Sequence, residues 1–126
     1  MPEKKLSQVK KKAWRIFSEY YRRKHADSQG YARCYTCGVR KHWKELQVGH
    51  LLDGRYNSIL FDEHVVRLQC RRCNLFLGGN KEVFIPKFID EMGRDVYDGL
   101  IRQKHQTVKY SVSDLEDMIE MWKANN

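Results

Sequence analysis

Apolar residues near the start of the chain recur at the three- and four-residue spacing of one helix face. Between residues 4 and 25 the stripe comprises Leu6, Val9, Ala13, Ile16, Phe17 and Tyr20, widened by Trp14 and Tyr21. Lysine and arginine occupy much of the remaining circumference. The pattern predicts a basic amphipathic helix whose apolar face packs against the rest of the protein.

Helical periodicity returns in the last third of the chain. We expect a helix that begins at Pro86, because a missing N–H is harmless in the first turn, and that ends at Gly93. A second helix is expected over residues 94–104. Ser113 and Glu116 have the spacing of a capping box, which predicts the start of a final helix. These helices should pack on the N-terminal helix.

The middle of the chain contains shorter apolar runs separated by turn residues. Residues 46–52 have the length and composition of a strand, Asp53-Gly54 is a turn signal, and residues 58–61 are expected to return as the partner strand. Residues 65–68 lead into a cysteine pair, after which a helix would begin. Short strands followed by helices predict an α+β fold.

All four cysteines fall into two C-x-x-C pairs, Cys34/Cys37 and Cys70/Cys73. Two residues between ligands let one turn supply two sulfurs about 2.3 Å from a Zn²⁺ ion, so two such pairs fit a closed tetrahedral site. Two redox dithiols, or four unrelated buried cysteines, are the alternatives. Zinc between a hairpin turn and a helix start is the treble-clef arrangement, and a hairpin that carries a histidine before a helix is the ββα-metal arrangement.

Length and composition indicate one small domain of 126 residues that an ion would help to stabilise. Nothing resembles a secretory signal or a membrane span, because the longest apolar runs are only a few residues and the N-terminus is charged. We therefore expect a cytoplasmic protein. A reducing compartment favours zinc thiolates over disulfides.

The net charge of +8 is uneven along the chain. Residues 1–25 carry nine Lys/Arg against two acids, residues 31–80 eight against four, and residues 81–126 seven against nine. Such asymmetry is typical of a nucleic-acid binder, although a merely solvated surface is the alternative and a membrane surface is less favoured. The candidates for DNA phosphate contacts are Lys10, Lys11, Lys12, Arg40, Lys41, Arg55, Arg67, Arg71 and Arg72.

Several short motifs together resemble a known family. They are Cys34-Tyr-Thr-Cys37-Gly38, Val48-Gly49-His50, Phe61-Asp62-Glu63, Gln69-Cys70-Arg-Arg-Cys73-Asn74 and Gly79-Asn80. The set is similar to the phage NinG family, which includes the lambda Rap recombination endonuclease, within the wider HNH, or ββα-metal, nucleases. The similarity runs from about Trp14 to the C-terminal helices and so covers most of the chain.

The resemblance implies a role for each matching residue. The four cysteines match structural zinc ligands. His50 matches the general base that takes a proton from the water attacking a phosphodiester, which a neutral imidazole can do near pH 7. Asn74 matches the position that helps to hold a catalytic divalent ion, Mg²⁺ or Mn²⁺, which stabilises the developing charge and the leaving 3′ oxygen.

The chain also departs from the superfamily pattern at two positions. Many members have an acid or histidine directly before the base, where this chain has Gly49, although the NinG-like pattern has glycine there too. The middle asparagine of the pattern is Val65 here, and the neighbouring His64 is the candidate replacement as a metal ligand. The alternatives are purely structural roles, in which His50 is a core histidine and Asn74 only caps a helix.

These features combine into one hypothesis with two rivals. The hypothesis is a single HNH-like domain over residues 1–126, with a basic helix in 1–30, a zinc and catalytic core in 31–80 and supporting helices in 81–126. By resemblance it would cut DNA, including branched DNA, in phage recombination or DNA processing in the host cytoplasm; a homodimer is one oligomeric state it allows. The rivals are a non-catalytic zinc DNA-binding module and a protein-interaction adaptor.

Overall fold

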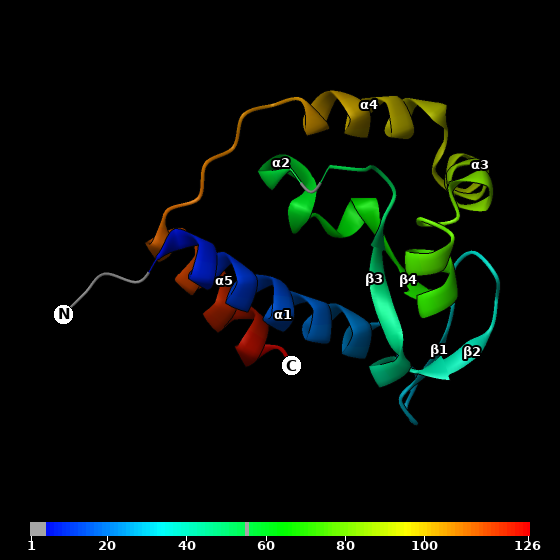
Figure 1. Cartoon of the computed structure of the whole chain (residues 1–126), viewed down its shortest axis with the longest axis horizontal. Helices are drawn as coiled ribbons and strands as arrows, with labels where there is room; N and C mark the ends of the chain where they lie inside the picture. Colours follow the sequence, from blue (N-terminus) through cyan, green and yellow to red (C-terminus); the bar gives the residue numbers. More distant parts are fainter. Residues whose placement is uncertain (1–4, 55) are drawn as a thin grey trace.

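The computed structural model, which describes residues 5–54 and 56–126, contains helices and two small antiparallel sheets (Figure 1). The α+β composition expected from the sequence is confirmed. The elements are α1 (Leu6–Lys24), β1 (Tyr31–Arg33), β2 (Arg40–His42), β3 (Leu46–His50), α2 (Asn57–Leu60), β4 (Val66–Cys70), α3 (Lys81–Met92), α4 (Arg94–Lys104) and α5 (Val112–Ala124).

Helix α1 is the amphipathic helix that the N-terminal pattern predicts. Its apolar face buries Ala13 and Phe17 completely, and this face packs along α5, the red helix beside the blue one in Figure 1. Three basic residues occupy its last turn, where cations interact favourably with the negative end of the helix dipole. Of the three C-terminal helices expected to pack on α1, α5 does so, whereas α3 and α4 pack mainly against each other.

The strand that pairs with β3 is not the one expected. Residues 58–61 were predicted to return as its partner, but this prediction is wrong, because residues 57–60 form the short helix α2. The consecutive residues Ile59 and Leu60 are both buried, which a strand with one solvent face cannot achieve. The partner is β4, in a register that places Leu46 opposite Cys70 and His50 opposite Val66.

Two predicted helix starts are also wrong. Helix α3 begins at Lys81, so Pro86 lies inside it; a proline there forfeits one backbone hydrogen bond, and the helix continues because Phe84 and Phe88 are fully buried beneath it. Helix α5 is capped by Ser111. Its hydroxyl accepts from the Asp114 amide at 3.0 Å, and the Asp114 carboxylate accepts from the Ser111 amide at 2.9 Å.

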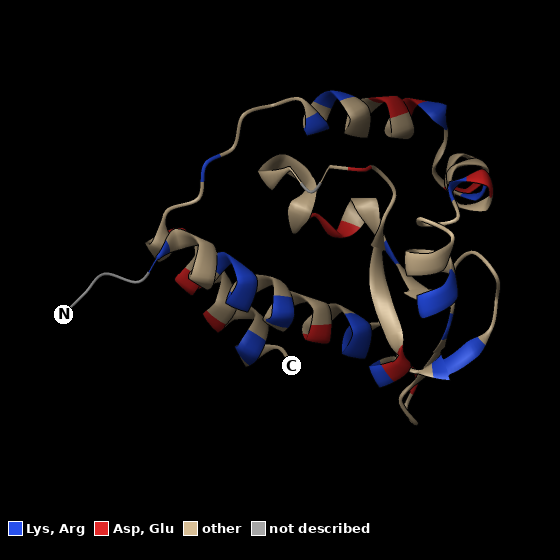
Figure 2. Cartoon of the chain, in the orientation of Figure 1, with Lys and Arg blue, Asp and Glu red and all other residues tan. Residues whose placement is uncertain are grey.

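Two other helix limits agree with the sequence. Helix α4 spans residues 94–104 as expected, and α3 ends at Gly93, whose φ of 91° suits glycine. Figure 2 shows basic residues along α1 and around the β1–β2 hairpin, with several acids on α3, α4 and α5. Among the described residues, no helix combines the length and apolarity that a membrane crossing requires.

Candidate zinc centre and adjoining hollow

The fold brings all four cysteines together from two separate turns. Cys34 and Cys37 belong to the turn between β1 and β2, Cys70 ends β4, and Cys73 lies in the π-helical turn that follows, residues 72–76. Their sulfur atoms all lie within 4.8 Å of one another, and those of Cys37 and Cys70 are 3.7 Å apart. Only Cys37 is exposed.

This geometry fits a structural zinc ion. Four sulfurs about 2.3 Å from one tetrahedral ion lie about 3.8 Å from each other, close to the spacing of Cys37 and Cys70. Burial alone would raise the pKa of Cys34, but hydrogen bonds from Thr36 and from the amides of Cys70 and Cys37 outweigh it and lower the pKa to about 6. Burial and the neighbouring thiols raise the pKa of Cys73. Against a hydrogen bond from the Val39 amide, burial and the neighbouring thiols also raise the pKa of Cys37 to about 12. By the spacing of their sulfurs, the four cysteines could hold zinc in the way the sequence predicts.

A buried glutamine, which the sequence pattern did not reveal, ties this centre to β3. Gln69 has no exposed surface, and its amide nitrogen donates to Thr36 Oγ1 at 3.1 Å and to the Gly79 carbonyl at 2.7 Å. It occupies the space beside Gly49, where a Cβ atom would lie 1.9 Å from Gln69 Oε1. Glycine before His50 is therefore required by packing, which accounts for the first departure from the superfamily pattern.

His50 and Asn74 line one hollow of about 500 Å³ next to the cysteine cluster. His50 ends β3, and Asn74 directly follows the last cysteine. The hollow opens between α1, β3 and the turn after β4, and no carboxylate is among the described residues that line it. Its lining residues are Trp14, Ser18, Arg22, Lys44, Leu46, Gln47, Val48, His50, Asn74 and Leu75.

Contacts fix the orientation of the His50 ring. Its Nε2 lies 3.2 Å from the Leu60 carbonyl oxygen, which can only accept a hydrogen bond, so Nε2 carries the proton. In the neutral ring Nδ1 is then the nitrogen with the lone pair. The Trp14 ring stacks on the imidazole with a centroid distance of 5.2 Å.

Asn74 is oriented by a neighbouring amide. Its Nδ2 donates to Gln47 Oε1 at 2.8 Å, which leaves the Asn74 side-chain oxygen as an acceptor. An oxygen so placed suits a hard divalent cation, since Mg²⁺ prefers oxygen ligands. Asn74 makes no side-chain cap at the start of the π-helical turn.

Arg22 and Lys44 give the hollow positive charge, and the sequence analysis had not singled out either one. Arg22 Nη1 donates to the Trp43 carbonyl at 3.2 Å, and its Nε donates to Ser18 Oγ at 3.1 Å. Burial lowers the pKa of Arg22 from its ordinary value, yet an arginine stays charged at neutral pH. The sequence does contain a signal for Arg22: Trp14, Ser18 and Arg22 are spaced four residues apart, which places them on one face of the predicted helix.

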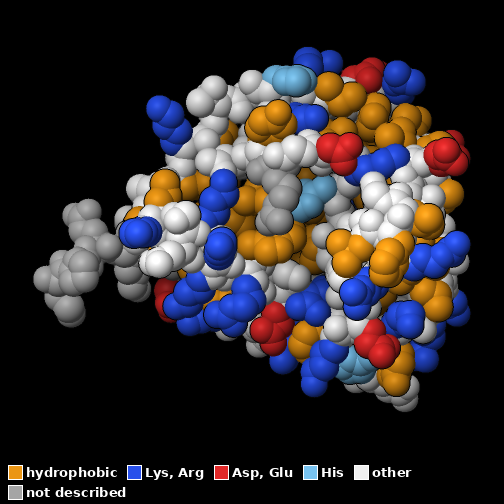
Figure 3. Space-filling model, viewed as in Figure 1, with side chains coloured by type: hydrophobic (Ala, Val, Ile, Leu, Met, Phe, Trp, Pro, Cys, Tyr) orange, Lys and Arg blue, Asp and Glu red, His pale blue; other side chains and the backbone are white. Residues whose placement is uncertain are grey.

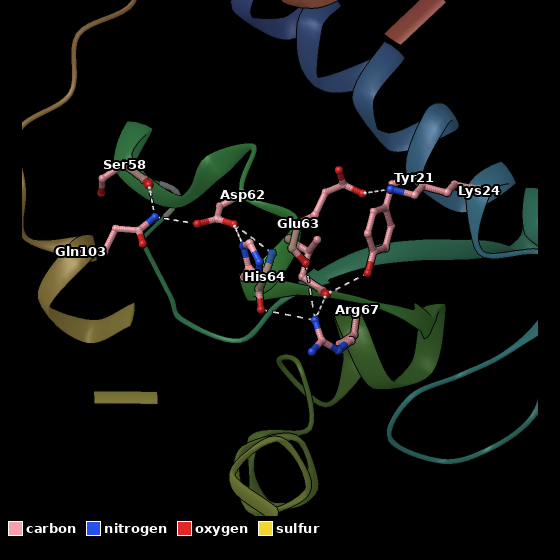
Figure 4. A network of polar contacts seen from close by, with 9 residues as sticks. Tyr21, Lys24, Ser58, Asp62, Glu63, His64, Arg67 and Gln103 are labelled. Carbon is pink, nitrogen blue, oxygen red and sulfur yellow. Dashed lines mark hydrogen bonds and ion pairs between the residues drawn. The ribbon is translucent and has the colours of Figure 1, made fainter. Parts of the chain in front are cut away.

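His64 lies outside this hollow. It is exposed, its Nδ1 is 2.8 Å from Asp62 Oδ1, and it lines a different hollow of about 640 Å³. Figure 4 shows Asp62 between His64 and Gln103, with Arg67 below them. Val65 has no exposed surface, and neither Val65 nor His64 lines the hollow that contains His50 and Asn74.

The basic residues of α1 face two directions. Lys10 and Lys11 line a depression that shares Trp14 with the His50 hollow. Lys12 instead faces a depression between α1 and α5 whose lining includes Glu120. Lys10 and Lys11, but not Lys12, thus adjoin the candidate site.

The remaining phosphate-contact candidates differ in their freedom to bind. Arg71 and Arg72 are exposed beside the last cysteine pair, and Lys41 is half-buried in β2. Arg40 pairs with an aspartate at 3.2 Å, and Arg67 donates to the Val66 carbonyl at 2.7 Å under the Phe88 ring, which makes Arg67 a structural residue. Arg55 lies outside the described residues.

A family model described as the bacteriophage lambda NinG protein matches residues 2–126. Neither the comparison with curated proteins nor that with solved structures finds a match. Most of the motifs that suggested this resemblance supply the cysteine cluster or residues of the hollow beside it. Because the family model spans nearly the whole chain, the protein belongs to the NinG family.

Proposed function

We propose that this NinG-family protein is a metal-dependent DNA endonuclease of the HNH type, with a treble-clef or ββα-metal core. The observation that carries the proposal is the placement of His50 and Asn74 in one hollow beside the four-cysteine cluster. A base and an oxygen ligand for a cation are the two groups that metal-assisted phosphodiester hydrolysis needs. Phage recombination or DNA processing is the corresponding setting, and branched DNA belongs to the proposed substrates.

His50 is the general base. With Nε2–H donating to the Leu60 carbonyl, the Nδ1 lone pair accepts a proton from a water molecule, whose oxygen attacks the phosphorus atom. The bond from phosphorus to the 3′ oxygen breaks as the new phosphorus–oxygen bond forms. The Trp14 ring holds the imidazole in this orientation throughout.

Asn74 would hold the catalytic ion through its side-chain oxygen, and a bound Mg²⁺ or Mn²⁺ would stabilise charge at the scissile phosphate. No carboxylate lines this hollow in the described part of the chain. The phosphate oxygens of the DNA would then supply much of the ligand set, so we expect weak ion binding in the absence of DNA.

Arg22 and Lys44 position the phosphate. Arg22 is held by the Trp43 carbonyl and Ser18, so its guanidinium is ordered before DNA binds. A preordered cation loses little conformational freedom on binding and can stabilise charge that develops in the transition state. Lys10 and Lys11 would extend the basic surface along the DNA backbone next to Trp14.

One rival, a zinc-containing DNA-binding module without catalysis, is favoured because no carboxylate is found among the described residues lining the hollow. The experiment that separates the two incubates plasmid, linear and four-way-junction DNA with the protein in Mg²⁺, Mn²⁺ or EDTA. The endonuclease cuts at least one substrate with a divalent ion and none with EDTA. Tight DNA binding without cleavage under every ion would establish the rival.

Two variants then assign the roles. His50→Ala should lower the cleavage rate by about 10²- to 10⁴-fold and should not respond to more metal. Asn74→Ala should lose a similar factor through weaker ion binding and recover in part at high Mg²⁺ or Mn²⁺. Both variants should keep their zinc content and DNA affinity, which serve as controls for folding.

A further inference from the structure

Three large apolar side chains stand exposed in a row directly after the cysteine cluster. Leu75, Phe76 and Leu77 are exposed by 54%, 74% and 43%. Phe76 is the most exposed of the large hydrophobic side chains in the described part of the chain. Contiguous exposed apolar surface on a small protein is typical of a binding site.

The backbone beneath these side chains is firmly held. The Leu77 amide donates to the Arg72 carbonyl at 2.9 Å, which closes the π-helical turn, and the Gly79 amide donates to the Cys73 carbonyl at 2.8 Å. The Gly79 carbonyl accepts from the buried Gln69. Widened turns of this kind are frequent at functional sites. Phe76 therefore projects from a rigid support that the zinc ligand Cys73 anchors.

Positive charge surrounds this apolar turn. The Arg71 guanidinium lies 5.7 Å from the Phe76 ring centroid, and Arg72 is exposed in the same turn. Leu75 lines the His50 hollow together with Lys44. In Figure 3 apolar and basic side chains gather side by side over the turn that follows β4, next to the hollow.

We propose that Phe76, supported by Leu75, is a wedge that stacks on exposed DNA bases next to the cleavage site. Apolar surface ringed by arginines fits a ligand with a polyanionic backbone and flat apolar faces, which describes a nucleic-acid strand with unstacked bases. The inference rests on the proposed function for the identity of the substrate. It assigns preference for junctions, gaps and other interrupted duplexes to this turn.

The test uses 2-aminopurine, a base whose fluorescence rises when it unstacks, placed at the branch of a four-way junction. All measurements are made with no added divalent ion and no chelator, so binding is observed without cleavage and the cysteine cluster keeps its zinc. The unmodified protein should raise the fluorescence, and Phe76→Ala should abolish the rise and weaken junction binding by about 5- to 100-fold. The control is Met121→Ala, which removes another exposed apolar side chain, 54% exposed, from α5.

The salt dependence separates stacking from charge. Phe76→Ala should leave the slope of log affinity against log salt unchanged, whereas Arg71→Ala should make it shallower. An unaltered fluorescence rise and junction affinity in Phe76→Ala would overturn the wedge, and so would a homodimer in sedimentation that Phe76→Ala dissociates. If Phe76→Ala still cuts DNA with an unchanged preference for junctions, the wedge proposal fails and the endonuclease proposal stands. If the fluorescence rise depends on Phe76 but no DNA is cut, the endonuclease proposal fails and the wedge proposal stands.

Discussion

Adding one methyl group at Gly49 should destabilise the protein strongly. The new Cβ atom would lie 1.9 Å from Gln69 Oε1 and 2.7 Å from Gln69 Cδ, far inside any tolerated contact. Gln69 has no exposed surface and therefore no room to retreat. It would have to give up its hydrogen bonds to Thr36 and to the Gly79 carbonyl, which connect the two cysteine turns.

The magnitude follows from these contacts. Overpacking a core typically costs about 1–3 kcal/mol, and each lost hydrogen bond adds about 0.5–1.5 kcal/mol. Gly49→Ala should therefore cost about 2–6 kcal/mol. Gln69→Ala loses the same hydrogen bonds but creates no clash. The double variant, Gly49→Ala with Gln69→Ala, should be no less stable than Gln69→Ala alone. The sum of the two single destabilisations should therefore exceed that of the double variant by about 2 kcal/mol or more.

Urea unfolding of the four proteins, with zinc content measured in parallel, tests this reasoning. Gly99→Ala in α4 is the matched control, because its Cβ would meet only the end of Arg102, at 3.6 Å. Alanine is favoured over glycine inside a helix, so that control should be neutral or slightly stabilising. A Gly49→Ala protein as stable as the parent, or additive effects of Gly49→Ala and Gln69→Ala, would refute the argument.

Three further predictions concern zinc, DNA and pH. Cys70→Ser should release zinc and lower the melting temperature sharply, because zinc binding is coupled to folding; full zinc content in that variant would refute the site. Replacing Lys10 and Lys11 by alanine should shallow the salt dependence of DNA binding by about 0.9 per phosphate contact, whereas Lys12→Ala should not. Burial alone would raise the pKa of Asp62, but hydrogen bonds from Gln103 and His64 outweigh it and lower the pKa. The ionised Asp62 therefore stabilises the folded protein fully above the pKa that this group has in the unfolded chain. That stabilisation is lost as the pH falls through the lower pKa of the folded state. The stability difference between Asp62→Asn and the parent, measured by urea unfolding, should vanish over that acidic range.

The sequence predicted local elements well and one long-range pairing badly. Helix α1 and helix α4 follow from apolar periodicity, and the four-cysteine cluster that could hold zinc follows from cysteine spacing. The partner of β3 does not, because the turn signal at Asp53-Gly54 suggested a short hairpin. The actual pairing with β4 depends on Cys70 lying opposite Leu46, a contact that no local pattern encodes.

The candidate site divides in the same way. His50 and Asn74 were named from motifs, and the structure brings them into one hollow. Arg22 and Gln69 were missed, since each acts through contacts with residues distant in sequence. The choice of Ser111 over Ser113 as the helix cap also needed the structure, because both have an acidic residue three positions later.

The packing of α5 on α1 also bears on how the protein is made. Trp122 contacts Phe17 and Phe61, with centroids 5.1 and 5.3 Å apart, and Phe61 in turn contacts the Trp14 ring that covers His50. A nascent chain still lacking residues 112–124 has no such cover over its first helix. For the proposed endonuclease, we expect a chain truncated before Val112 to bind zinc yet cut no DNA, so that during translation the proposed activity would arrive only with the last helix.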